Sequence, residues 1–194
     1  NRIKLYNIKL NLHFVLDRYS INDAIDWLKN PPDFLEKINA IIFLNYKPIN
    51  SSSDLLLNKS SRIKEFFSLV NRKHKFKVGF DSCSVSGIVD EMEVNPIYFE
   101  SCEAASFSAF ISEDMKMYPC SFMSDTDLYA DLTNYSIIDV WQKSKTFIDH
   151  RNNIKNNSCK DCEHEKLCQG GCVFLPEINL CKTTERIIST CPNK

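Results

Sequence analysis

The sequence predicts an α/β protein in two parts: parallel strands with covering helices over residues 1–80, and a small cysteine-rich domain over residues 81–194. Two observations predict this division. Strand and helix patterns alternate through the first part, an order that is typical of parallel strands joined by right-handed crossovers. All nine cysteines of the 194-residue chain lie between Cys83 and Cys191, so a different chemistry organises the second part.

Three apolar runs predict the strands of the first part. Residues 8–16 alternate apolar and polar side chains before turning fully apolar, residues 40–46 form a uniformly apolar run, and residues 76–80 end just before the first cysteine. Runs of this kind are typical of parallel strands in a covered sheet. Between the strands, residues 21–28 and 63–70 carry apolar side chains at helical spacing, which predicts two amphipathic helices.

Local signals mark both ends of the first helix. Ser20 precedes the first apolar residue of the helix and has Asp23 three positions later, which predicts a cap at Ser20. Asn30-Pro31-Pro32 follows the helix. Proline lacks an N–H group and disfavours helical geometry in the residue before it, so we expect the helix to end there.

Three strands and two helices amount to somewhat less than half of an eight-stranded α/β barrel. Alone they would expose apolar sheet edges, so we expect the missing half to lie upstream in a longer chain or on a partner chain. An open three-layer α/β domain is the alternative. Asn45 and Lys47 lie at the C-terminal end of the second strand, where such barrels place ligand contacts, and are candidate binding residues.

Shorter elements are expected in the second part. Residues 107–111 and 115–118 predict a β-hairpin with its turn at residues 112–114, and residues 137–148 predict one helix. The polar residues 152–158 predict a loop. From Cys159 onward, cysteines take the place of an apolar core, as in small domains that a metal stabilises.

Composition argues against several classes of protein. The 24 basic and 25 acidic residues give a formal net charge of −1, which argues against nucleic-acid binding and against attraction to a membrane surface. No apolar run approaches the ~20 residues that span a bilayer, and the N-terminus has no signal-peptide pattern, so we expect a cytoplasmic protein. An odd number of cysteines is unusual for a secreted disulfide scaffold and favours metal ligation.

The densest cysteine pattern is C-x2-C-x5-C-x3-C, with Gly170-Gly171 immediately before its last cysteine. Thiolates are soft ligands that select iron–sulfur clusters, zinc or Cu(I). Zinc is the serious alternative, because a zinc ribbon needs only four such ligands and His164 lies within the run. The total of nine cysteines supplies two sets of four ligands with one to spare, which favours two iron–sulfur clusters. The pattern comprises Cys159, Cys162, Cys168 and Cys172, and the other cysteines are Cys83, Cys102, Cys120, Cys181 and Cys191.

This pattern, together with Tyr118-Pro119-Cys120 and the terminal Cys191-Pro192, resembles the SPASM domain, the auxiliary-cluster domain of radical S-adenosyl-L-methionine (SAM) peptide-modifying enzymes. The resemblance covers about residues 76–194 and extends to Trp141 and Arg151. The first part is similar to the late strands of a radical SAM partial barrel. The fold that the resemblance implies is the C-terminal half of a partial (β/α) barrel followed by a SPASM domain with a β-hairpin and short helices.

The resemblance implies two auxiliary [4Fe-4S] clusters with interleaved ligands. The last cysteine of the dense pattern belongs to the proximal cluster, although its neighbours in the sequence hold the distal one. Asn45 and Lys47 become candidate contacts to SAM or to substrate. The proximal ligands are Cys83, Cys102, Cys120 and Cys172, and the distal ligands are Cys159, Cys162, Cys168 and Cys191, with Cys181 as the alternate for Cys191.

The implied activity is radical modification of a peptide, a ribosomally made precursor, with a thioether or another crosslink as the expected product. In that family a third [4Fe-4S] cluster, bound through C-x3-C-x2-C, cleaves SAM to a 5′-deoxyadenosyl radical. The motif is absent from this sequence, so we expect this segment to act only within a longer chain or a complex.

Met115 replaces a glycine of the family before Cys120, which predicts a different turn. Ser121 replaces the aspartate of the sulfatase-maturing branch, which argues against that activity.

Two other functions fit the same residues. A zinc-stabilised binding module without catalytic activity would hold one or two zinc ions and no sulfide. A two-cluster electron-transfer protein would hold the iron but bind no peptide, and it would leave the α/β part of the chain without a role.

Overall fold

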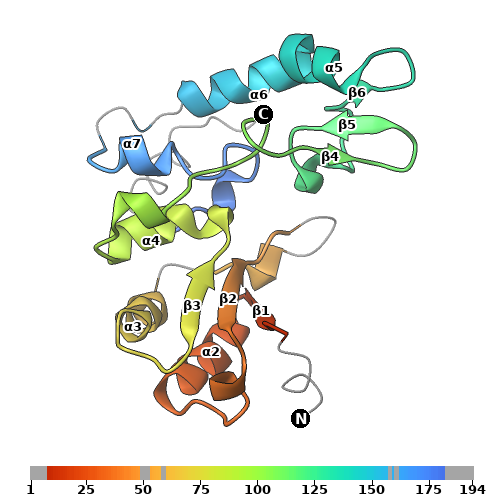
Figure 1. Ribbon diagram of the computed structural model, residues 1–194. Helices are drawn as coiled ribbons and strands as arrows, with labels where there is room; N and C mark the ends of the chain where they lie inside the picture. Colours follow the sequence, from red (N-terminus) through yellow and green to blue (C-terminus); the bar gives the residue numbers. More distant parts are fainter. Residues whose placement is uncertain (1–7, 49–52, 58–59, 157–158, 160–161, 182–194) are drawn as a thin grey trace.

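The computed structural model describes residues 8–181 except 49–52, 58–59, 157–158 and 160–161. Its first part is a parallel sheet of three strands in the order β1-β2-β3 (Figure 1). This confirms the predicted parallel α/β arrangement, whereas its completion into a barrel stays a prediction. The strands are β1 Asn11–Leu16, β2 Ala40–Asn45 and β3 Lys77–Phe80.

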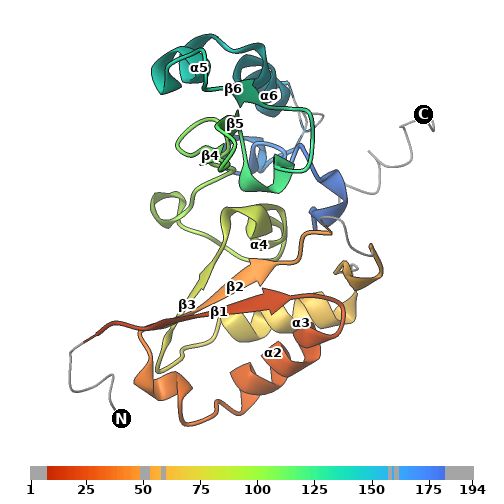
Figure 2. The ribbon, with the colours of Figure 1, turned by 90° about the vertical axis from the view of Figure 1, so that its right-hand side faces the viewer.

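Two amphipathic helices, α2 (Ser20–Lys29) and α3 (Ser61–Val70), lie side by side on one face of this sheet (Figures 1 and 2). Their apolar residues enter the core, where the rings of Phe43 and Phe66 meet edge to face with their centroids 4.9 Å apart. The central strand β2 is buried along most of its length, as its uniformly apolar sequence predicts. Two 3-10 turns complete this part, η1 Leu35–Lys37 and η2 Ser53–Leu55.

The prediction that Ser20 caps α2 is wrong, because Asp17 occupies that role. The Asp17 carboxylate accepts the N–H groups of Tyr19 at 2.7 Å and Ser20 at 2.8 Å, and Ser20 Oγ accepts the Asp17 N–H at 2.8 Å. This reciprocal pair is a capping box that begins three residues earlier than predicted. A carboxylate can accept both N–H groups and also places negative charge at the helix N-terminus. The predicted end is confirmed, since α2 stops at Lys29.

The second part contains a small antiparallel sheet of β4 (Phe110–Ile111), β5 (Lys116–Tyr118) and β6 (Ala130–Asp131). β4 and β5 form the predicted hairpin. Met115, in its turn, has a φ of 61°, the left-handed conformation that glycine adopts most easily. Methionine thus stands where glycine would be unstrained. β6 was not predicted, because a two-residue strand is too short to show an alternating pattern.

The single helix predicted over residues 137–148 is in fact two helices, α5 (Ile137–Lys143) and α6 (Lys145–Lys155). Ser144 separates them with an extended backbone, φ −67° and ψ 139°, and its hydroxyl accepts the Phe147 N–H at 3.4 Å. Serine competes with helix continuation because it can cap a new helix. α6 then continues into the stretch predicted as a loop, because one of its faces is buried. That face comprises Phe147, His150 and Ile154.

The end of the described chain returns to the first part of the protein. Leu180 belongs to the buried cluster of the sheet, and its N–H donates to Ser86 Oγ at 2.9 Å. Ser86 and Gly87 lie on α4 (Val85–Glu91), which follows β3. A Cβ on Gly87 would lie 3.1 Å from the Leu180 side chain, so glycine allows this close approach. The sheet and the cysteine-rich part therefore share buried contacts.

The remaining elements are four 3-10 turns and the single-turn helix α7. None of the helices in the described ranges has the length and apolar character needed to cross a membrane. These elements are η3 Ser82–Ser84, η4 Pro96–Tyr98, η5 Ser121–Met123, α7 Glu165–Cys168 and η6 Pro176–Ile178.

Candidate metal centre

Four cysteines that are far apart in the sequence line one cavity. Cys83 lies in η3 just after β3, Cys102 in the loop before the hairpin, Cys120 between β5 and η5, and Cys172 directly after the double glycine. Every pair of these thiols is close enough to interact electrostatically. The structure therefore brings together the four residues predicted as ligands of the proximal cluster.

The end of β2 anchors the Cys83 segment. Asn45 is 4% exposed, and its side-chain amide donates to the carbonyl of Cys83 at 3.4 Å and to that of Ile178 at 3.0 Å. Its backbone N–H meets the Asp81 carboxylate at 3.3 Å. Asn45 therefore ties the sheet to two segments that line the cavity. Its predicted contact with SAM or substrate stays a prediction.

Arg151 holds the segments around Cys120 in place. Ala105 has a φ of 56°, and its N–H donates to the carbonyl of Pro119 at 3.1 Å. The Arg151 guanidinium donates to the carbonyl of Ala105 at 3.0 Å and to that of Trp141 at 2.8 Å. Arg151 and Trp141 are both part of the resemblance found in the sequence. Through these hydrogen bonds they stabilise the segments that carry Cys102 and Cys120.

A left-handed turn positions Cys172. Gln169, Gly170 and Gly171 have φ values of 52°, 86° and 68°. Asn179 closes the turn: its Oδ1 accepts the Cys172 N–H at 2.8 Å, and its Nδ2 donates to the carbonyls of Gly170 at 3.3 Å and Cys172 at 3.1 Å. A Cβ on Gly171 would lie 2.2 Å from Asn179 Oδ1, so only glycine fits this position.

Backbone N–H groups are directed at the sulfurs of the cavity. The Leu175 N–H donates to Cys172 Sγ at 3.2 Å. The backbone N–H groups two residues after Cys102 and two residues after Cys120 interact with those sulfurs in the same way. Hydrogen bonds of this kind stabilise negative charge on sulfur, and they are among the groups that set the potential of an iron–sulfur cluster.

Burial favours the protonated form of these thiols. It raises the pKa of Cys83 from an ordinary value of 9.0 to about 12, and the pKa values of Cys102 and Cys172 to about 11. The positive charge of Lys47 opposes this rise at Cys83 without cancelling it. A metal that binds these sulfurs must displace their protons, so its affinity increases with pH.

Two polar side chains share the cavity with the sulfurs. Lys47 forms a partly buried ion pair with Asp81, and its ammonium lies 4.9 Å from the centre of the Phe122 ring. His150 is 6% exposed, and its Nε2 has no hydrogen-bond partner among the described residues. Burial and the nearby Arg151 charge lower the pKa of His150, so its ring is neutral at pH 7. The sequence marked Lys47 as a candidate but did not reveal His150, whose one signal was its place beside Arg151.

A second group of cysteines surrounds α7. Cys159 interacts electrostatically with Cys162 and Cys181, and Cys168 interacts with Cys159 and Cys181. Burial raises the pKa of Cys168 to about 12, and the N–H groups of the double glycine interact with its sulfur. The structure thus brings together three of the predicted distal ligands and the alternate fourth, Cys181. Cys191 lies outside the described residues.

The donor set of the proximal cavity fits an iron–sulfur cluster. It provides four sulfurs, N–H donors to them, a largely apolar wall and one unpartnered imidazole. Over the ranges that the structure describes, no three His, Cys, Asp or Glu side chains form a ligand group for a single metal ion. His164, which left a zinc site open in the sequence, is one-third exposed and lies 3.6 Å from the Glu163 carboxylate.

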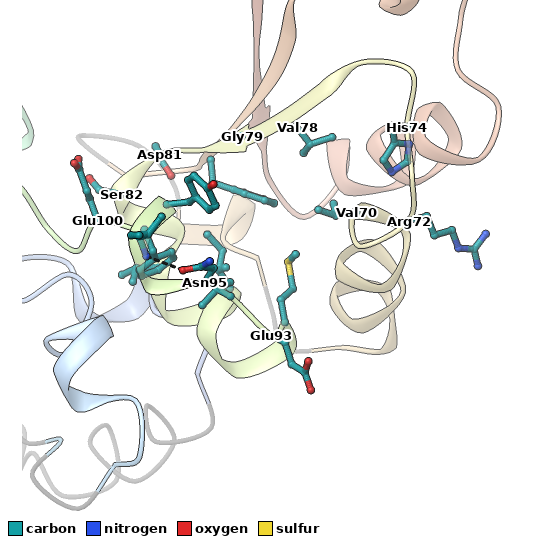
Figure 3. A pocket seen from close by; sticks show the side chains of 18 of the residues that line it. Val70, Arg72, His74, Val78, Gly79, Asp81, Ser82, Glu93, Asn95 and Glu100 are labelled. Atoms are coloured by element: carbon teal, nitrogen blue, oxygen red, sulfur yellow. Dashed lines mark hydrogen bonds between the residues drawn. The ribbon is translucent and has the colours of Figure 1, made fainter.

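A groove of about 720 Å³ runs along β3 and the segment around η4. Figure 3 shows Asp81 and Glu100 at one end of this groove and Arg72 at the other. Tyr98, on the η4 side, is 88% exposed. Because Asp81 also forms the ion pair with Lys47, this one pair links the groove to the cysteine-lined cavity.

Comparison with known proteins identifies part of the chain. Residues 102–163 match the family model of SPASM, an iron-sulfur cluster-binding domain. No curated protein and no solved structure matches the chain. The matched range includes Cys102, Cys120, Cys159 and Cys162, which belong to both cysteine groups. The chain therefore contains a SPASM domain, a domain that binds iron–sulfur clusters, as the cysteine pattern and its resemblance predicted.

Proposed function

We propose that this chain is the auxiliary-cluster part of a radical SAM peptide maturase and that it holds two [4Fe-4S] clusters. The observation that carries the proposal is the convergence of four distant cysteines on one cavity, two of them inside the matched SPASM range. Four sulfurs are what one [4Fe-4S] cluster requires. The proximal ligands are Cys83, Cys102, Cys120 and Cys172, and the distal ligands are Cys159, Cys162 and Cys168 with Cys181 or Cys191.

The residues of this chain would hold a bound cluster in place and adjust its reduction potential through their charges and their burial. When bound, the clusters would supply an electron acceptor or an open iron atom for substrate. Lys47 places a positive charge at the cavity wall, which favours the more negative, reduced state of a bound group. The wall formed by Phe122, Phe174 and Leu175 keeps water out and so strengthens that effect. SAM and its own cluster would be bound by an upstream segment or by a partner chain.

The groove along β3 supports a peptide as the substrate. Among the described strands, β3 pairs only with β2, so its other edge is free. The Asp81 N–H donates to Phe43 O at 3.1 Å, toward β2, and consecutive residues of a strand alternate in direction. Val78 and Phe80 therefore direct their N–H and C=O groups to the free edge, where an extended peptide can add as a further strand.

Charge in the groove favours a basic peptide. Glu93, Glu100 and Glu103 line it, and the described residues provide no ion pair for any of them. Arg72 lies at the far end. We therefore infer an extended substrate segment with lysine or arginine close to the residue that is modified.

Iron and acid-labile sulfide in anaerobically purified protein test the cluster proposal. We expect about eight iron and eight sulfide per chain, the content of two four-iron clusters, together with a brown charge-transfer absorbance. One or two zinc ions without sulfide would instead establish the zinc-stabilised binding module.

Peptide binding separates a maturase from a two-cluster electron-transfer protein. We expect a labelled, end-blocked peptide of alternating valine and lysine to bind the loaded chain in an anisotropy assay. N-methylation of alternate peptide nitrogens should weaken binding about 3- to 10-fold for each lost hydrogen bond. Glu100→Gln should also weaken it, whereas Glu113→Gln, the same change on the exposed hairpin turn, should not. A loaded chain that binds no such peptide would favour electron transfer.

A further inference from the structure

His150 is the one described histidine that is buried with an unpartnered ring nitrogen. It lies on α6, on the same buried helix face as Phe147 and Ile154. The Arg151 hydrogen bonds to Ala105 and Trp141 hold this part of α6 in place. A buried polar atom without a hydrogen-bond partner destabilises the fold, so its retention calls for an explanation.

The surroundings of Nε2 offer few partners apart from sulfur. His150 lines the cavity of the proximal cysteines. Lys47, the one other residue there with a side-chain nitrogen, carries only donors and is already paired with Asp81. The remaining wall is aliphatic and aromatic side chains. The side-chain acceptors within reach of this cavity are therefore its four sulfurs and whatever they bind.

We propose that His150 is a positioning residue for the proximal cluster, whose Nε2–H donates a hydrogen bond to a sulfur of the bound group. This inference rests on the proposed cluster binding. A [4Fe-4S] cluster presents sulfide and thiolate sulfurs, which accept hydrogen bonds, so it selects the tautomer with the proton on Nε2. Such a bond is stronger when the cluster is reduced and more negative, so His150 raises the reduction potential of the proximal cluster.

Two substitutions of His150 in the loaded chain test the hydrogen bond. His150→Phe keeps an aromatic ring but removes the donor, whereas His150→Gln keeps an N–H donor at a similar reach. In an EPR-monitored redox titration we expect His150→Phe to lower the proximal potential and His150→Gln to restore most of the shift. The distal cluster serves as the internal control, and its potential should not move in either variant.

A spectroscopic measurement keeps the proposal testable if His150→Phe fails to retain the proximal cluster. In wild-type protein labelled with ¹⁵N-histidine, ENDOR of the reduced cluster should show a weak nitrogen coupling, which a loaded His150→Gln variant, with no histidine at this position, should lack. A strong coupling typical of direct iron ligation, or no coupling at all, would overturn the proposal. So would a fully loaded His150→Phe variant with an unmoved potential. A chain without iron and sulfide would overturn the cluster proposal itself, so the two failures are distinguishable.

Discussion

The proximal and distal cysteine groups are built in different ways. The proximal sulfurs come from four separate segments, and residues outside the group hold those segments: Asn45, Arg151 and Asn179. The distal sulfurs come mostly from one local stretch around the single-turn helix α7. The folded chain therefore prepares the proximal site before any metal arrives, whereas the distal site depends more on the metal for its own order.

The largest expected effect comes from Cys172→Ser. Cys172 is close in sequence to the distal ligands but lies in the proximal cavity. We expect the loss of about four of the eight irons, all of them from the proximal cluster. Iron analysis together with Mössbauer or EPR spectra of the remaining cluster measures this. Iron loss confined to the distal cluster would show that the ligands are not interleaved.

The fourth distal ligand is decided by comparing Cys181→Ser with Cys191→Ser. The family pattern predicts Cys191, which lies outside the described residues, whereas Cys181 lies close enough to both Cys159 and Cys168 to interact with them electrostatically. On that evidence we expect Cys181→Ser to release the distal iron and Cys191→Ser to retain it. Iron content and the surviving spectrum report the result, and the reverse outcome would establish Cys191 as the ligand.

The part of this comparison that the sequence could predict follows from local signals. The uniformly apolar run predicted β2, and the helical spacing of apolar residues predicted α3. The cysteine ligands could also be predicted, because their residue type and spacing can be read directly from the sequence. Asn179 and His150 were not, because their roles depend on segments that meet only in the folded protein. The helix break at Ser144 was missed for a related reason: serine tolerates a helix interior unless its hydroxyl can cap the next helix, as it does here.

Alkaline pH should destabilise the cluster-free chain more than the loaded one. Burial raises the pKa of Cys83 to about 12 and that of Cys172 to about 11, while unfolded thiols ionise near 9. Stability from these groups is therefore complete below pH 9 and is lost progressively as the pH rises from 9 through the folded pKa values of about 11 and 12. In the loaded chain the thiols have already given up their protons to bind iron.

Urea unfolding of both forms at pH 7.5 and pH 10.5 measures this difference. Lysine and tyrosine titrate in both forms, so the comparison between forms isolates the thiols. Cys83→Ala should reduce the alkaline loss of the cluster-free chain. Equal losses in the two forms would mean that the folded protein does not hold these thiols protonated.

The smallest predicted effect concerns Gly171, which lies between a distal ligand, Cys168, and a proximal one, Cys172. Gly171→Ala forces a left-handed conformation on alanine and places its Cβ against Asn179, so we expect a loss of about 1–3 kcal/mol in the free energy of unfolding. Gly79→Ala in β3 is the matched control, because the added methyl meets only the flexible end of the Ile42 side chain on the neighbouring strand β2.

The clusters of the Gly171→Ala variant extend the same comparison. Asn179 accepts the Cys172 N–H, so displacing it should loosen the proximal ligand first. The distal sulfurs lie mostly on one short stretch around α7, which can shift as a unit when the turn changes. The distal cluster should therefore be retained. We therefore expect proximal iron to be released to a chelator faster than distal iron, while Gly79→Ala releases both as the wild type does. If both clusters of Gly171→Ala were released together, the two sites would share one framework, and the proximal site would be no more prepared by the fold than the distal one.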